Sequence, residues 1–195
     1  MTTAAKTAME VLQNDPDLAP YVVEHGPLTL NPAENLFERL VRSLVRQQIS
    51  MDAADAIHER LSRRFELTPQ VLVDAETEAL GDAGLSGAKI EYLKALSAAF
   101  LENQYSREYF SALDDEAVLH ELTAIRGVGP WTGKMFLMFG LGREDVFPVE
   151  DLGVRRGMEV ICREEMTRGE MRDRASKWQP YRSYASLYLW RAYEG

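Results

Sequence analysis

A short turn in the second half of the chain decides the fold. Its residues read Ile125-Arg126-Gly127-Val128-Gly129-Pro130-Trp131. Apolar residues recur at helical spacing before this turn, from Asp114 or Asp115 onward, and after it, as far as about Leu141. Two glycines permit positive φ, and the valine between them can turn back into the core. The stretch therefore predicts two helices joined by a very tight connection.

The same turn has the features of an anion site. Pro130 falls in the first turn of the second helix, where a missing N–H costs nothing. The remaining N–H groups there carry about half an elementary positive charge, and no bulky side chain stands in front of them. Arg126 and Lys134 add to this charge. A phosphate of a nucleic-acid backbone is the expected ligand, although Gly-x-Gly between helices is equally typical of an ordinary helical hairpin.

Upstream of the turn, a capping pattern predicts the start of another helix. Asn31 is expected to be the N-cap, with Pro32 at the first helical position and Glu34 at the third. The apolar stripe expected on this helix comprises Leu36, Leu40, Leu44 and Val45. Such a stripe buries one face of the helix against a core.

The remaining chain is also helical in its spacing. Ser50 is expected to cap the next helix, and a longer helix follows the break that ends at Gly87. Two more helices are expected over about residues 151–163 and 181–193, joined by a polar segment at about 167–177. Period-2 alternation is absent, so the sequence predicts an all-α protein.

Composition limits the class of protein. The chain has 195 residues, 46% of them hydrophobic, and at about 100–200 residues per domain it forms one domain or two small lobes. No apolar run approaches the roughly 20 residues of a membrane span, and no secretory signal is readable. We therefore expect a cytoplasmic protein without a membrane partner. Its single cysteine, Cys162, excludes an internal disulfide, a cysteine-based zinc site and a four-thiolate iron–sulfur cluster.

Charge is unevenly distributed along the chain. The net charge of −9 argues against a polycation that coats nucleic acid without regard to sequence. However, residues 1–120 carry 10 basic and 20 acidic side chains, whereas residues 121–195 carry 12 and 11. The C-terminal part can therefore approach a polyanion while the acidic part faces away, unless the difference is random unevenness.

Several linked blocks resemble one family. Residues 122–133, followed by Phe147-Pro148-Val149-Glu150-Asp151, resemble the helix-hairpin-helix and Gly/Pro-Asp signature of a DNA glycosylase superfamily. Three further blocks are similar to its 3-methyladenine DNA glycosylase II (alkylbase glycosylase) branch: residues 45–50, residues 84–89, and residues 178–185 with Trp190. The resemblance covers the chain from Asn31 to the C-terminus.

The resemblance implies a fold of two helical lobes, with the helix-hairpin-helix at the rim of a DNA-binding cleft between them. One lobe, residues 36–143, is expected to be a helical barrel that contains the hairpin at about residues 115–141. The other lobe, residues 1–35 with residues 144–195, is expected to carry Asp151. The thirty residues before the first matched helix are too few for the N-terminal β domain of the best-known bacterial member.

The resemblance also implies a reaction. Cleavage of an N-glycosidic bond passes through an oxocarbenium-like transition state, which needs a negative charge near C1′. Asp151 matches the family's catalytic aspartate, whereas outside this family an aspartate at a helix start is an ordinary N-cap. The implied enzyme excises alkylated purines such as 3-methyladenine and 7-methylguanine from duplex DNA in base excision repair. Whether Asp151 stabilises the cation or orients a water is left open by the sequence.

Aromatic residues around the turn match the family's base pocket. Bifunctional relatives place a lysine where this chain has Trp131, so we expect a monofunctional enzyme that leaves an intact abasic site. Trp131 and Trp190 are expected to hold the cationic base by cation–π contact. Met135 stands where the bacterial relative has a tyrosine.

The family's remaining contacts with DNA also map onto this chain. The target base must leave the duplex, and Gln48 with Gln47 is expected to act as the wedge that fills the gap, unless these residues only pack or cap the loop before Ser50. The residues expected to contact the DNA backbone are Gly127, Gly129, Thr132 and Lys134. A Na⁺ or K⁺ ion is expected on the backbone carbonyls of Thr123, Ile125 and Val128. No other cofactor is required, and a monomer is the expected state.

Two other functions remain open at this stage. A helix-hairpin-helix protein can recognise DNA damage without cutting a bond, and a glycosylase can act on mismatched, oxidised or otherwise modified bases. Relatives of the second kind tend to use the missing lysine or a four-cysteine iron–sulfur cluster, which disfavours it. The sequence does not distinguish among alkylated or deaminated bases.

Overall fold

The computed structural model describes residues 2–195, whose regular structure is helical throughout, with no strand in that range. The fold is therefore all-α, as the sequence predicts. The helices are α1 (Thr3–Leu12), α2 (Ala19–His25), α3 (Leu36–Arg46), α4 (Met51–Arg64), α5 (Pro69–Asp74), α6 (Thr77–Asp82), α7 (Gly87–Asn103), α8 (Arg107–Ser111), α9 (Asp115–Thr123), α10 (Pro130–Phe136), η1 (Leu137–Leu141), α11 (Leu152–Cys162), α12 (Arg168–Ala175), η2 (Ser176–Trp178) and α13 (Arg182–Glu194). The η1 turn is π-helical and continues α10. No helix within residues 2–195 combines the length and apolarity that crossing a membrane requires.

The chain forms two compact units. The aspartate unit comprises Met1–Pro32 and Gly142–Gly195, and the hairpin unit comprises Ala33–Leu141. The sequence analysis places these divisions at residues 35/36 and 143/144. Each unit has its own buried apolar core.

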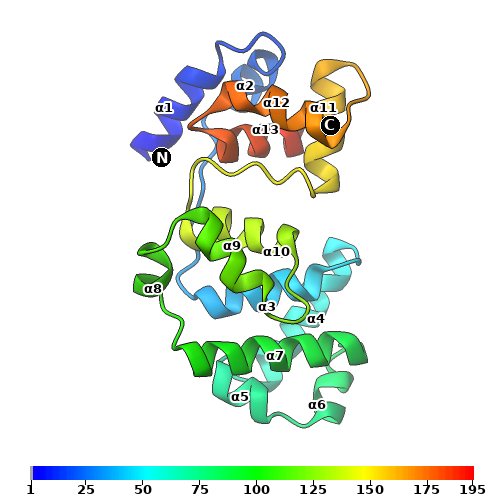
Figure 1. The fold of residues 1–195 in the computed structure, drawn as a ribbon. Helices are drawn as coiled ribbons and strands as arrows, with labels where there is room; N and C mark the ends of the chain where they lie inside the picture. Colours follow the sequence, from blue (N-terminus) through cyan, green and yellow to red (C-terminus); the bar gives the residue numbers. More distant parts are fainter. Residues whose placement is uncertain (1) are drawn as a thin grey trace. The chain divides into compact units, whose positions relative to one another are not determined.

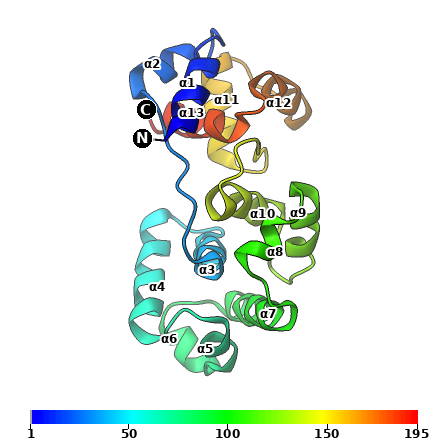
Figure 2. The same ribbon diagram turned by 90° about the vertical axis from the view of Figure 1, so that its left-hand side faces the viewer.

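In the hairpin unit, α3 occupies the centre of the packing. It contacts α4, α7, α10 and η1, and α7 runs alongside α5 and α6 (Figures 1 and 2). Leu40 and Leu44 of α3 are fully buried, as their helical spacing predicts. Residues 47–50, which follow α3, are thereby carried on a rigid element.

Helix starts in the hairpin unit follow capping chemistry, with one correction. Asn35, not Asn31, caps α3, and its side chain accepts the N–H of Glu38 at 3.1 Å. The expected start at Asn31 and Pro32 is wrong because the N–H of Ala33 donates to the carbonyl of Phe139 at 2.8 Å, which holds this segment against the end of η1. An Asn-Pro pair therefore mimics a capping signal four residues before the true one.

In the aspartate unit, α11 and α13 cross at very short range. A Cβ at Gly157 would lie 1.9 Å from the carbonyl oxygen of Leu189, and a Cβ at Gly153 would lie 2.7 Å from Cδ1 of Trp190. The two glycines are four residues apart, so they lie on one face of α11. This face lets the backbone of α11 lie directly against α13.

The polar segment at 167–177 contains α12, which the sequence analysis did not predict as a helix. Thr167 and Glu170 form a complete capping box at its start. Arg174 of α12 forms ion pairs with Asp15 and Asp17, and Trp178 donates to Asp15 at 3.0 Å. Burial opposes ionisation of Asp15, but the hydrogen bonds from Arg174 and Trp178 hold its pKa below the usual value. This network ties the N-terminal segment to the C-terminal helices.

The close helix crossing predicts the effect of one added methyl group. Gly157→Ala should lower the free energy of unfolding by about 1–3 kcal/mol, because the new Cβ meets backbone atoms of α13 that have no rotamer to adopt. Urea denaturation followed by circular dichroism measures the change. Gly169→Ala in α12 is the control, since a Cβ there makes only an ordinary contact; equal losses in the two variants would contradict the crossing.

Candidate functional site

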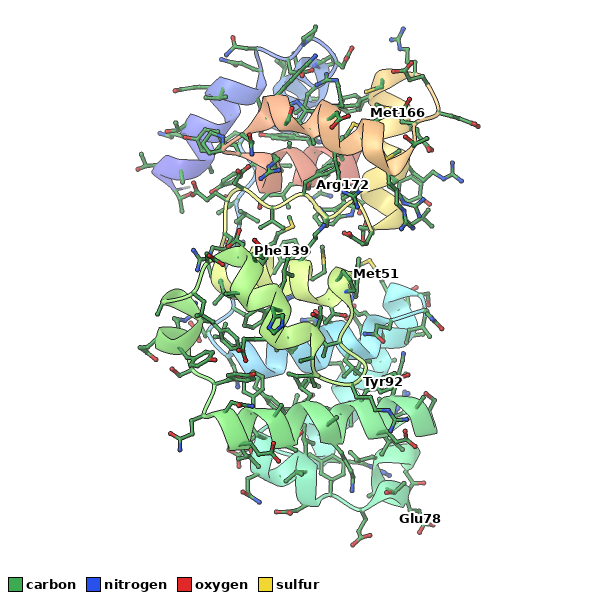
Figure 3. The ribbon with its side chains drawn as sticks, in the orientation of Figure 1. Met51, Glu78, Tyr92, Phe139, Met166 and Arg172 are labelled. Atoms are coloured by element: carbon green, nitrogen blue, oxygen red, sulfur yellow. The ribbon has the colours of Figure 1, made fainter. Side chains whose placement is uncertain are left out.

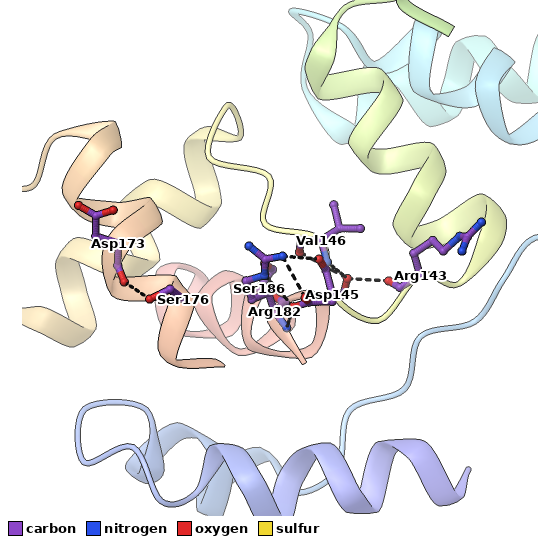
Figure 4. A network of polar contacts seen from close by, with 8 residues as sticks. Arg143, Asp145, Val146, Asp173, Ser176, Arg182 and Ser186 are labelled. Carbon is purple, nitrogen blue, oxygen red and sulfur yellow. Dashed lines mark hydrogen bonds and ion pairs between the residues drawn. The ribbon is translucent and has the colours of Figure 1, made fainter. Parts of the chain in front are cut away.

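The segment that leads to Asp151 is fastened to the start of α13. Arg182 donates from Nε to Oδ1 of Asp145 at 2.7 Å and from Nη2 to Oδ2 at 3.0 Å (Figure 4). Ser183 donates to the carbonyl of Arg143 at 2.6 Å and accepts the N–H of Val146 at 2.9 Å. Arg182 is therefore bound internally, as a clamp on residues 143–146.

Two tight turns then deliver Asp151 to the start of α11. The N–H of Val149 donates to the carbonyl of Phe147 at 3.0 Å, and the N–H of Asp151 donates to the carbonyl of Pro148 at 2.8 Å. Phe147 and Val149 are buried. An apolar strap therefore anchors the backbone immediately before the half-buried aspartate.

The carboxylate of Asp151 is held by two donors. Its Oδ1 accepts the N–H of Val154 at 2.9 Å, which makes Asp151 the N-cap of α11. The same oxygen accepts Nε1–H of Trp190 at 2.8 Å. A cap needs only the first of these bonds. The second comes from a different helix, α13, and fixes the orientation of the carboxylate.

Gly153 makes the bond from Trp190 possible. A Cβ at this position would lie 3.0 Å from Nε1 of Trp190 and 3.2 Å from Oδ1 of Asp151. Any larger residue would therefore occupy the space in which the indole reaches the carboxylate. The sequence analysis did not single out Gly153 or Gly157. The sequence feature that could have indicated them is two glycines spaced by four in the helix that Asp151 caps.

The hairpin in the other unit connects α9 to α10 through residues 124–129. Gly127 has a φ of +89°, in the left-handed region that favours glycine. A Cβ there would lie 2.1 Å from Cγ of Tyr92 on α7 (Figure 3). Gly129, by contrast, has a φ of −98°, so it does not use the positive φ that glycine permits.

Gly129 leaves the start of α10 uncovered. It is the N-cap of α10, and a Cβ there would meet nothing within 4 Å. The backbone at this helix start is therefore open on the side where a side chain would stand. Pro130 follows it at the first helical position, as predicted.

Gln47 is bound to the hairpin, which argues against its predicted role as a wedge. Its Nε2 donates to the carbonyl of Gly127 at 2.9 Å and to Oγ1 of Thr132 at 3.0 Å. An amide nitrogen has only two hydrogens, so these bonds use both. Thr132 is 1% exposed, so its expected contact with a DNA backbone is also wrong. Burial under the hairpin leaves this side chain no path to a phosphate.

Gln48 has the opposite character. Its side chain is exposed, and its φ of +59° is left-handed, which is uncommon for a residue with a Cβ. Capping of α4 belongs to Ser50, whose side chain accepts the N–H of Ala53. Capping therefore does not account for Gln48, and its role as a wedge stays a prediction.

The other predicted site residues are distributed over the two units. Trp131 and Lys134 are half-buried on α10 of the hairpin unit, and Met135 beside them is 4% exposed. Trp190, which is half-buried, belongs to the aspartate unit with Asp151. The contact between Asp151 and Trp190 was not predicted, although both residues were.

The carbonyls predicted to bind a cation lie at the end of α9 and in the hairpin. The carbonyl of Ile125 accepts the N–H of Val128 at 3.0 Å, which uses one of its two lone pairs. Thr123 is exposed, and its hydroxyl donates to the carbonyl of Leu119 at 2.7 Å. Neutral backbone oxygens of this kind suit a hard cation of low charge.

A row of three arginines on α3, of which Arg42 forms an ion pair with Asp55, was not predicted. Burial, together with the charges of Arg46 and Arg42, lowers the pKa of Arg39 to about 10. The guanidinium of Arg39 lies 5.0 Å from the ring centroid of Phe139, in a cation–π contact. The three arginines follow the helical spacing i, i+3, i+7 on α3 and end directly before Gln47.

Comparison with known proteins gives a consistent family. A family model described as "HhH-GPD superfamily base excision DNA repair protein" matches residues 41–180. The Bacillus subtilis protein YfjP is 30% identical over 182 residues, which cover 88% of this chain and 63% of that protein. DNA-3-methyladenine glycosylase 1 of Schizosaccharomyces pombe is 32% identical over 162 residues, which cover 80% of this chain and 71% of that protein.

A solved structure is similar over nearly the whole chain. It is that of Schizosaccharomyces pombe 3-methyladenine DNA glycosylase Mag1 in complex with abasic DNA, with a TM-score of 0.88 and 29% identity. The match covers 95% of each chain. An 8-oxoguanine glycosylase/lyase of Clostridium acetobutylicum has a TM-score of 0.82 at 18% identity, which shows a shared fold.

The bond between Trp190 and Asp151 predicts a spectroscopic change. The chain has three tryptophans, whose indole N–H groups give separate NMR signals. Asp151→Asn should shift the signal of Trp190, because the acceptor changes from a carboxylate to an amide. The signal of Trp178, which donates to Asp15, is the internal control. An unmoved Trp190 signal would show that the bond is not formed in solution.

Proposed function

Because this chain belongs to the HhH-GPD superfamily of base excision DNA repair proteins, in its 3-methyladenine DNA glycosylase branch, we propose that it is a monofunctional DNA N-glycosylase. Its substrates are alkylated, cationic purines in duplex DNA, and its product is an abasic site. The chain spans 63% of YfjP and 71% of the fission yeast glycosylase.

The observation that carries the proposal is the fixed carboxylate of Asp151. Its Oδ1 holds the N–H of Val154 and the indole N–H of Trp190. A carboxylate oriented in advance stabilises a developing oxocarbenium ion without reorganising during the reaction. One such group is enough when the leaving base is already activated by alkylation. Asp151 is therefore assigned as the catalytic residue.

The departing base is a cation, and aromatic side chains suit it. A purine alkylated at N3 or N7 is attracted to an indole face with about 0.5–2 kcal/mol. Trp131 and Trp190 are assigned to the base pocket on this ground. Trp190 donates its N–H to Asp151, so its edge orients the acid while its face is used for the base. Met135 completes the proposed pocket with a polarisable, non-aromatic side chain.

The enzyme is proposed to lack lyase activity. A lyase needs an amine that attacks the sugar and forms a Schiff base. The position at which lyases of this superfamily carry lysine is Trp131 in this chain, and an indole supplies no such nucleophile. Hydrolysis is then the only outcome, and the abasic strand stays intact.

The hairpin is proposed to hold the DNA backbone. Gly129 supplies an amide at a helix start where no side chain stands, Gly127 supplies a second amide in the turn, and Lys134 adds charge on α10. A Na⁺ or K⁺ ion on the carbonyls of Thr123, Ile125 and Val128 would join the hairpin to a phosphate. No other cofactor is proposed. We propose further that the protein acts as a cytoplasmic monomer.

Asp151→Asn tests the proposed reaction. Release of free 3-methyladenine and 7-methylguanine from methylated duplex DNA, measured by chromatography, should fall at least on the order of 100-fold. Binding to the same DNA should persist, because the change is nearly isosteric. The parent protein should leave strands uncut until alkali or heat is applied; a break without either would contradict the assignment as monofunctional.

Glu150→Gln is the matched control for Asp151→Asn. Glu150 is the adjacent acid and lies 3.9 Å from Arg172 in a weak ion pair. Base release should remain within about twofold of the parent, because the removed charge belongs to a partly exposed ion pair with Arg172 and the carboxylate of Asp151 is unchanged. A parent protein that binds damaged duplex yet releases no base would favour the non-catalytic damage-binding function instead.

Gln48→Ala tests the wedge. Binding to lesion-containing duplex should weaken on the order of tenfold, because nothing then fills the space left by the flipped base. Binding to a single strand of the same sequence should change little, since a single strand has no gap to fill. Fluorescence anisotropy measures both affinities. Equal losses for duplex and single strand would remove Gln48 from this role.

A further inference from the structure

Gln47 joins two segments that are far apart in sequence. It directly follows the last residue of α3, and its Nε2 donates to Gly127 in the hairpin and to Thr132 in the first turn of α10. Gly127 and Thr132 are 80 and 85 residues away along the chain. One side chain therefore connects the turn that carries Gln48 to the hairpin that is proposed to hold a phosphate.

The turn at Gln48 needs such support. A left-handed φ of +59° at a residue with a Cβ is a strained conformation, which persists only when its surroundings impose it. Three residues before it, the carbonyl of Val45 accepts Nζ–H of Lys89 at 2.6 Å, and burial lowers the pKa of this lysine. Directly before it, Gln47 is bound to the hairpin. The strained residue therefore follows a segment that is fixed at two points.

The hairpin is held by the same bond. The peptide between Gly127 and Val128 has its carbonyl bound by Gln47 and its N–H bound to the carbonyl of Ile125. Both polar groups of this peptide are occupied, so its plane cannot rotate freely. Tyr92 closes the adjacent space at Gly127. The orientation of the hairpin backbone therefore depends on Gln47 as well.

Thr132 shows that this connection is part of the core. The residue is 1% exposed, and a buried hydroxyl without a partner is costly. Gln47 supplies that partner. The link then reaches α10 at the residue next to Trp131, which is proposed to face the base.

We propose that Gln47 is a positioning residue that sets the distance between the wedge Gln48 and the phosphate-binding hairpin. This rests on the proposed function, because it gives Gln48 and the hairpin their roles. A wedge can enter the base stack only if the strand is gripped at a matching distance. Gln47 fixes that distance through two hydrogen bonds, so capture of the backbone and insertion of the wedge occur in one rigid geometry.

A double-mutant cycle tests this coupling. Gln47→Met keeps the length of the side chain and removes both donors. The probe is a duplex that contains a tetrahydrofuran analogue of an abasic site, with affinity measured by anisotropy. In the parent background Gln48→Ala should weaken binding about tenfold, whereas in the Gln47→Met background it should weaken binding by less than about twofold. A merely structural role of Gln47 would leave the effect of Gln48→Ala unchanged.

Two further variants test whether the effect of Gln47→Met comes from its lost hydrogen bonds. Gln70→Met makes the same substitution on α5, where the side chain bonds only to Asp74, and it should bind like the parent. Thr132→Val removes one of the two partners of Gln47, and it should reduce the effect of Gln48→Ala in the same direction. Circular dichroism checks that each variant retains its helices.

Hydrogen exchange separates this proposal from the proposed function. Loss of the Gln47 bonds should speed exchange of the Val128 amide about tenfold, because its peptide is then held from one side only. Unchanged exchange at Val128, or equal effects of Gln48→Ala in both backgrounds, would overturn the role of Gln47. A parent protein that does not distinguish the lesion duplex from undamaged duplex would instead overturn the proposed function, whatever the exchange result.

Discussion

The hydrogen bond between Trp190 and Asp151 is the interaction on which the proposed chemistry of this protein depends. It exists because α11 and α13 approach until their backbones touch, and that approach needs glycine at 153 and 157. The clamp of Arg182 on Asp145 and the strap at residues 147–149 bring the acid to the same crossing. An acid that would otherwise be only a helix cap thereby acquires a fixed direction.

In the hairpin unit, too, a side-chain donor from one helix fixes the conformation of a distant segment. Gln47 satisfies a buried hydroxyl and a turn carbonyl at once, and the left-handed residue Gln48 stands next to it. In both units a single side chain with strong donors joins segments that sequence distance separates. Polar contacts of this kind impose one geometry, because leaving their partners unpaired in the interior is unfavourable.

Much of the fold and part of the candidate site could be predicted from the sequence. Helical periodicity and the Gly-Val-Gly turn predicted the all-α fold and the start of α10, and the family blocks pointed to Asp151 and Trp190. The contact between those two residues was not predictable, since spacing along the chain carries no information on how α11 meets α13. The same limit explains Gln47. The resemblance pointed to a wedge there, and its hydrogen bonds to residues 127 and 132 could not be predicted because they join segments far apart in sequence. The predicted cap at Asn31 was wrong because a tertiary hydrogen bond from Ala33 to Phe139 overrode its capping signal.

The contact of Gly157 with the backbone of Leu189 has a consequence for how such a protein can diversify. Side chains that line a pocket can be exchanged one at a time, and each exchange alters which damaged base is accommodated. A residue packed against main chain cannot be enlarged in small steps, because backbone atoms have no alternative rotamer that would make room for the added atoms. Selection for new substrates is therefore expected to change the side chains that line the pocket, while the glycines that position the acid are retained.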